Sequence, residues 1–83
     1  MIYLDEKRNE YIQILTGELP TLRARIRISQ DELSRGVGIS RQTYSLIETG
    51  KQTMSWITFM AMIAFFSSNE KTRNELQRIG LID

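Results

Sequence analysis

The chain has 83 residues, a length that allows one small domain with a single modest hydrophobic core. It contains no cysteine and no histidine, so it lacks the commonest metal ligands and the usual acid–base group at neutral pH. We therefore predict no metal site and no cofactor. An enzyme is the least favoured class of function, because no nucleophile–base pair stands out among the remaining polar residues.

The distribution of charge says more than the net charge of +1. Residues 19–53 carry six lysines and arginines against three acidic residues, whereas residues 1–18 are net acidic and residues 54–83 are balanced. A basic middle segment favours a polyanionic partner. The N-terminus has no signal-peptide pattern, and the longest apolar stretch, residues 56–66, is too short for a membrane span of about 20 residues. We expect a soluble, cytoplasmic protein.

The first part of the chain carries one apolar stripe at helical spacing, formed by Ile12, Leu15, Leu19, Leu22 and Ile26. Gly17 and Pro20 interrupt this stripe, and proline costs about 3 kcal/mol inside a helix. We predict a first helix over about 5–15 and a second helix over about 18–26. A single kinked helix is the alternative. On this division, residues 1–17 are a helical extension and residues 18–83 form the main domain.

The later helices have recognisable start signals, end signals or both. Ser29 and Glu32 form a capping box, and Ser40 and Ser55 can cap helices in the same way. Glycines that tolerate the left-handed conformation follow three of the helices: Gly38, Gly50 and Gly80. Strand signals are nearly absent. The pattern predicts an all-α protein with further helices over about 30–37, 41–48, 55–66 and 70–78.

Residues 29–51 are the informative segment, because two short capped helices joined at Gly38 are typical of a helix-turn-helix. In that arrangement the second helix enters the major groove of DNA. Its exposed face would present Arg41, Gln42, Ser45 and Leu46. Arginine can bond guanine, glutamine can bond adenine, and leucine can contact a thymine methyl group.

The spacing of the whole segment resembles the lambda-repressor-like, or xenobiotic-response-element-type, helix-turn-helix regulators. The similarity covers about residues 19–66 and rests on Leu22-Arg23, Ser29-Gln30, Leu33-Ser34, Gly38-Ile39-Ser40-Arg41-Gln42-Thr43 and Ile47-Glu48-Thr49-Gly50-Lys51. It implies a five-helix DNA-binding domain, here with an extra N-terminal helix. It also implies duplex DNA as the partner.

The resemblance further implies roles for individual residues. Arg41, Gln42 and Leu46 match base-reading positions, and Ser45 shares their face. The residues that match or adjoin phosphate-contacting positions are Gln30, Ser40, Thr43, Thr49 and Lys51. Glu48 matches a carboxylate that pairs with an arginine of the first helix, here Arg23, as an internal brace that does not touch DNA.

Three residues depart from the family pattern. Ser34 replaces a small alanine, and Gly36 lies inside a helix, where glycine costs about 1 kcal/mol relative to alanine. Arg27 occupies a position where glycine often ends the first helix. It must either take a strained backbone or let the helix continue.

We therefore predict a transcriptional regulator that acts as a repressor, bound as a homodimer to an inverted repeat. The helix over about 55–66 is apolar on almost every side, so it must be buried on more than one side, and a second subunit or the N-terminal helix could supply part of that burial. Two alternatives remain open: an antitoxin that also binds a toxin, and a protein-interaction module that has lost DNA binding.

Overall fold

The computed structural model describes residues 2–83, with side chains from residue 5 onward, and this part of the chain is helical without strands. Its five helices are α1 (Ile2–Ile26), α2 (Gln30–Val37), α3 (Arg41–Glu48), α4 (Trp56–Ser67) and α5 (Glu70–Arg78). The predicted all-α class is confirmed, and the bounds of the last four helices agree with prediction to within one residue. None of the helices in residues 2–83 has the length and apolar character needed to span a membrane.

The predicted break between two N-terminal helices is wrong, because α1 runs without interruption through Gly17 and Pro20. The reason is the apolar stripe, which stays on one face across both residues. Four of its side chains are buried: Ile12, Leu15, Leu19 and Leu22. Burying each contributes about 1.5–3 kcal/mol, which together exceeds the roughly 4 kcal/mol that the proline and the glycine cost.

The predicted N-terminal serine caps and C-terminal glycines are confirmed. Ser29 accepts a hydrogen bond from the backbone N–H of Glu32 at 3.0 Å, while the Glu32 carboxylate accepts one from the Ser29 N–H at 3.1 Å. Ser40 and Ser55 each accept a bond from the third residue beyond them. The three predicted glycines all have positive φ angles, between 79° and 82°. Local chemistry alone therefore fixes where α2, α3 and α4 begin.

Arg27 adopts the strained backbone, with a φ of 56°, and α1 ends there. The N–H of Ile28 bonds the carbonyl of Arg23 at 3.1 Å and the N–H of Arg27 bonds that of Ala24 at 3.3 Å, the pattern of a Schellman end. A non-glycine residue in this conformation costs about 1–2 kcal/mol. The helix thus ends at the predicted place, although arginine is disfavoured in the left-handed conformation that ends it.

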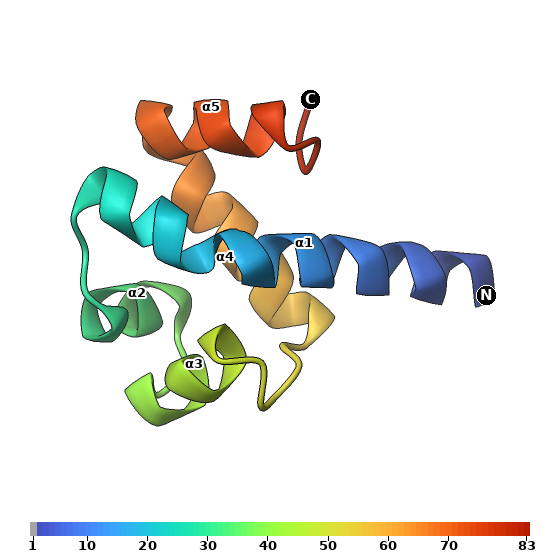
Figure 1. Cartoon of the computed structure of the whole chain (residues 1–83), viewed down its shortest axis with the longest axis horizontal. Helices are drawn as coiled ribbons and strands as arrows, with labels where there is room; N and C mark the ends of the chain where they lie inside the picture. The colour runs from blue at the N-terminus through green and yellow to red at the C-terminus, as the bar shows by residue number, and fades with distance from the viewer. Residues whose placement is uncertain (1) are drawn as a thin grey trace.

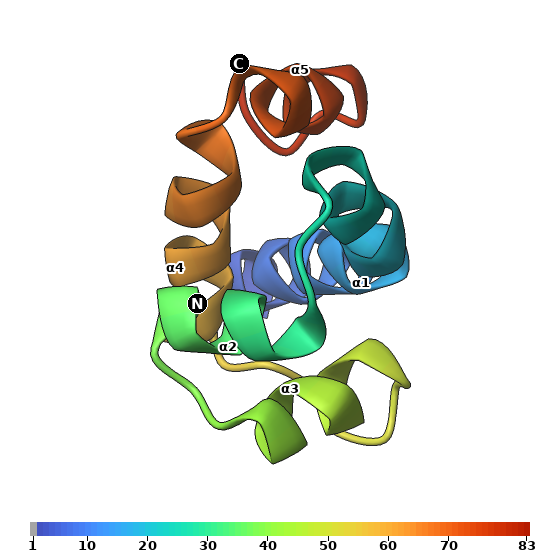
Figure 2. The ribbon, with the colours of Figure 1, turned by 90° about the vertical axis from the view of Figure 1, so that its left-hand side faces the viewer.

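The helices are arranged around α1 (Figure 1). α1 contacts α3, α4 and α5, and the two views place α3 and α5 on opposite sides of it (Figure 2). α4 packs against α1, α2 and α5. The core combines the α1 stripe with buried side chains of the other helices and of the segment that leads into α4: Leu33, Tyr44, Ile47, Met54, Phe59, Met62, Phe66 and Leu76.

The two small residues of α2 permit a close approach to its neighbours. Ser34 is buried, and its hydroxyl donates to the Asp31 carbonyl at 2.8 Å. A Cβ added to Gly36 would lie 2.4 Å from Cε2 of the Phe65 ring on α4. A side chain at this position would force the Phe65 ring to shift, so packing against α4 favours glycine, although it weakens the helix intrinsically.

The N-terminal part of α1 packs on the start of α4. The Tyr11 and Phe59 rings stack with centroids 6.5 Å apart, and the Arg8 guanidinium lies 5.1 Å from the centre of the Trp56 ring. The opposite face of α4 is uncovered, since Ile57 is 81% exposed and Met60 is 50% exposed. The N-terminal segment therefore covers only part of this apolar helix.

Candidate nucleic-acid interface

The α2–α3 pair is held as a rigid unit by apolar contacts with the rest of the core. Leu33 of α2 and Tyr44 and Ile47 of α3 are fully or almost fully buried. Both helices have only eight residues and could not be stable alone. Burial of one face against the core therefore sets the orientation of the other face of α3.

That outer face carries the predicted base-reading residues. Arg41, Gln42 and Leu46 are exposed, and Ser45 is partly exposed. They come from successive turns of α3, whose interior residues Tyr44 and Ile47 point into the core. The structure therefore gathers the four predicted residues on one accessible surface.

The ion pairs divide the basic residues of the middle segment into two groups. Arg23 pairs with Glu48, Arg25 with Glu75, and Arg35 with Asp31. Among the residues whose side chains are described, no carboxylate lies within 4 Å of the three other cations, which are Arg27, Arg41 and Lys51. All three are exposed. The unpaired positive charge of the middle segment thus lies just before α2, at the start of α3 and in the turn after α3.

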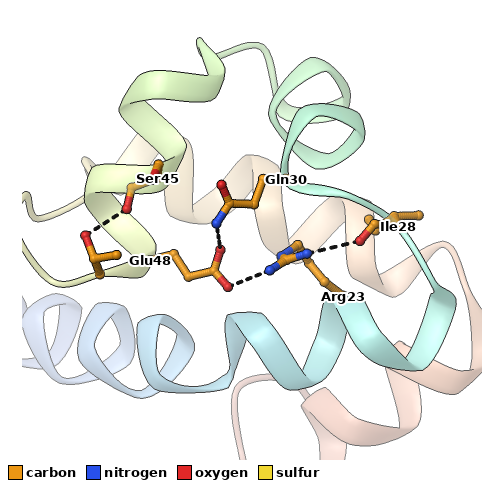
Figure 3. A network of polar contacts seen from close by, with 6 residues as sticks. Arg23, Ile28, Gln30, Ser45 and Glu48 are labelled. Carbon is orange, nitrogen blue, oxygen red and sulfur yellow. Dashed lines mark hydrogen bonds and ion pairs between the residues drawn. The ribbon is translucent and has the colours of Figure 1, made fainter.

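The predicted brace is present as part of a network that joins three helices (Figure 3). Arg23 Nη2 of α1 donates to Glu48 Oε1 at the end of α3 over 2.8 Å, and Arg23 Nη1 donates to the Ile28 carbonyl over 3.2 Å. The hydrogen bond to Glu48 is the main cause that raises the pKa of Arg23 above its usual value. The guanidinium therefore fixes both α3 and the chain that leads into α2.

Gln30, at the first position of α2, completes this network. Its Nε2 donates to Glu48 Oε2 over 2.8 Å, so both carboxylate oxygens are used (Figure 3). The resemblance to the family predicted only a phosphate contact for Gln30 and not this bond. No local spacing could have revealed it, because the two residues are 18 positions apart and meet only when α2 and α3 cross.

Tyr44 lies beneath the same network. Its hydroxyl is buried, and no hydrogen-bond partner for it is found among the described residues. The Arg23 guanidinium is 6.0 Å from the centre of its ring. Burial, followed by the nearby Glu48 carboxylate, raises the pKa of Tyr44, so the phenol stays neutral. The ring acts as apolar support for the brace.

The predicted phosphate-contacting hydroxyl groups differ in whether their proton is already used in an internal hydrogen bond. Ser40 Oγ accepts from the Thr43 N–H and donates to Thr43 Oγ1 at 2.9 Å, which leaves the Thr43 hydroxyl proton free. Thr49 Oγ1 donates to the Ser45 carbonyl at 2.8 Å. Lys51 is exposed beyond the end of α3. Thr43 and Lys51 are therefore better prepared to donate to an anion than Ser40 or Thr49.

Comparison with known proteins agrees with this geometry. A helix-turn-helix family model matches residues 19–61, just over half of the chain, and spans the C-terminal part of α1 through the first half of α4. None of the curated proteins and none of the solved structures matches the chain. The match includes the brace, both helices of the motif and the free cations of α3 and its following turn. The chain belongs to the lambda-repressor-like helix-turn-helix family of DNA-binding regulators.

Proposed function

We propose that this regulator represses transcription by occupying a promoter as a homodimer on an inverted repeat. The observation that carries the proposal is the outer face of α3, where exposed Arg41 has no acidic partner among the described side chains. Arg41 and Gln42 would bond base edges in the major groove, and Leu46 would contact a thymine methyl group. Ser45 would contact a base edge or a thymine methyl group.

The phosphate contacts would surround this reading surface. Gln30, Thr43 and Lys51 each retain a proton to donate, whereas Ser40 and Thr49 would first give up an internal hydrogen bond. The exposed apolar side chains of α4 support association with another protein surface, as a homodimer requires. Two copies would read half-sites about 34 Å apart.

The test is selection of bound duplexes from a randomised pool at about 0.15 M salt, near physiological ionic strength. We expect enrichment of an inverted repeat. Arg41→Ala should then cost about 1–3 kcal/mol and relax the preference at one base pair in each half-site. Lys51→Ala should weaken all sequences alike and reduce the salt dependence. An unchanged sequence preference with Arg41→Ala would contradict the assignment of α3 as the reading helix.

A second candidate function is suggested by the uncovered apolar face of α4. Exposed Ile57 and Met60 suit a protein partner, such as the toxin bound by an antitoxin or the target of an interaction module. Enrichment of a single half-site would indicate that the chain binds as a monomer or that such a partner completes the complex. No enrichment, with DNA released by modest salt, would favour the interaction module over the repressor.

A further inference from the structure

We propose that Glu48 is a positioning residue for DNA binding, which fixes the direction in which Gln30 presents its amide to phosphate. This inference rests on the proposed function. The two side chains meet where the start of α2 lies beside the end of α3, joined by the 2.8 Å bond from Gln30 Nε2 to Glu48 Oε2 (Figure 3).

The chemistry of the bond restricts the amide to one orientation. A carboxylate has only acceptors, so the Gln30 amide must turn its NH₂ group toward Glu48 and its carbonyl oxygen away. One N–H is used by Glu48 and the second stays free. A phosphate also offers only acceptors, and that second N–H is the group of this side chain that could bind it.

Arg23 keeps the carboxylate in place for this task. It holds Glu48 Oε1 at 2.8 Å, so Oε2 faces α2 and remains available to Gln30. If Glu48 were a neutral amide, Gln30 could rotate and present its carbonyl oxygen, which repels phosphate. The brace therefore does more than join α1 to α3, because it selects the end of Gln30 that faces the DNA.

A double-mutant cycle tests this role, with Glu48→Gln, Gln30→Ala and the combined variant binding the duplex enriched from the randomised pool. Gln30→Ala should weaken binding about tenfold, the size of one hydrogen bond to a charged group. Glu48→Gln should weaken binding by a similar factor in the unmodified background, but by less than about twofold in the Gln30→Ala background.

The sign of the Glu48→Gln effect separates positioning from simple charge. Removing a carboxylate raises the net charge from +1 to +2, which by itself tightens binding to DNA. A loss of affinity with an unchanged salt dependence is expected if the neutral amide of Gln30 is misdirected. Equal losses in both backgrounds, or no effect of Gln30→Ala, would overturn the positioning role alone. No specific binding by the unmodified chain would overturn the proposed function together with it.

A measurement on the unmodified chain covers the case in which Glu48→Gln does not fold. The two Nε2 protons of Gln30 should be resolved in a nitrogen–proton correlation spectrum, since one is bonded to a carboxylate. Adding the enriched duplex should shift the second proton and leave the first almost unchanged. If saturating DNA moves neither proton, Gln30 does not present its amide to phosphate and the proposal is wrong.

Discussion

Glu48 and Glu75 form two versions of the same structure, a covered carboxylate held by arginine, in opposite regions of the molecule. Glu48 joins α3 to α1 and α2 near the proposed DNA-reading face, and Glu75 joins α5 to α1 through Arg25 and to its own helix through Arg78. Their side chains are 8% and 5% exposed. The acidic halves of the two clusters are thus almost equally buried.

The basic halves differ. Arg23 is 21% exposed, whereas Arg25 is 50% exposed and Arg78 is 66% exposed. Water screens an exposed guanidinium strongly, and an exposed ion pair contributes little to stability. The two regions therefore depend on different forces. The half of the molecule that contains α3 depends on its polar brace, while α5 is held mainly by apolar burial of residues such as Leu76.

The largest expected effect comes from breaking the better covered cluster. Arg23→Ala leaves Glu48 without its charged partner, and losing one member of a covered ion pair costs about 3–5 kcal/mol. We expect a loss of that size in the free energy of unfolding, measured by urea titration with circular dichroism. Such a loss is a large fraction of the stability of a small domain.

Arg78→Ala is the matched control for Arg23→Ala. It also removes an arginine from a covered carboxylate, but Arg25 remains to pair with Glu75, and water already surrounds the lost group. We expect a much smaller loss of stability. Similar losses for the two variants would show that the exposure of the arginine does not determine the strength of these clusters.

The next effect tests the packing of α2 against α4. Gly36→Ala should gain about 1 kcal/mol of helix propensity, but overpacking against Phe65 typically costs about 1–3 kcal/mol. We expect a net loss of about 1 kcal/mol in the free energy of unfolding. With Phe65→Leu, which makes room for the new methyl group, the same Gly36→Ala change should become stabilising. A gain in both backgrounds would show that the ring moves aside without cost.

These variants concern features that the sequence revealed only in part. The serine caps predicted where α2, α3 and α4 begin, and the terminal glycines predicted where α2, α3 and α5 end, because each acts within one turn of the chain. Gly17 and Pro20 predicted a break that is absent. Their effect is also local, but the burial of Leu19 and Leu22 outweighs it, and burial depends on the whole fold.

Some features of the candidate site could likewise be predicted from the sequence, and others could not. The exposed face of α3 followed from helical spacing, and the pairing of Arg23 with Glu48 from resemblance to the family. Two other features had no signature in the sequence, because they depend on how the helices cross. They are the bond from Gln30 to Glu48 and the close approach of Gly36 to the Phe65 ring. The sequence shows that Arg27 stands where glycine often ends the first helix, but only the structure shows that its backbone takes the strained conformation.

That strain gives a smaller prediction of opposite sign. Arg27→Gly should raise the free energy of unfolding by about 0.5–1 kcal/mol, since relief of the left-handed conformation exceeds the added freedom of glycine in the unfolded chain. Arg27→Ala is the matched control, because it removes the same charge but keeps the strain. If both variants were equally stabilised, charge repulsion and not backbone conformation would be the cause.

The smallest effect concerns pH and the Glu75 cluster. The Arg78 guanidinium, through its hydrogen bond, is the main cause that lowers the pKa of Glu75 from the ordinary value of 4.5. Because the folded-state pKa lies below the unfolded one, this contribution is fully present above about pH 4.5 and is lost as the pH falls through the folded-state pKa. Glu75→Gln removes the titrating group. Its difference in unfolding free energy from the unmodified chain should be greatest near neutral pH and shrink on acidification. A difference that stays constant with pH would show that Glu75 stabilises the fold through the packing of its side chain and not through its charge.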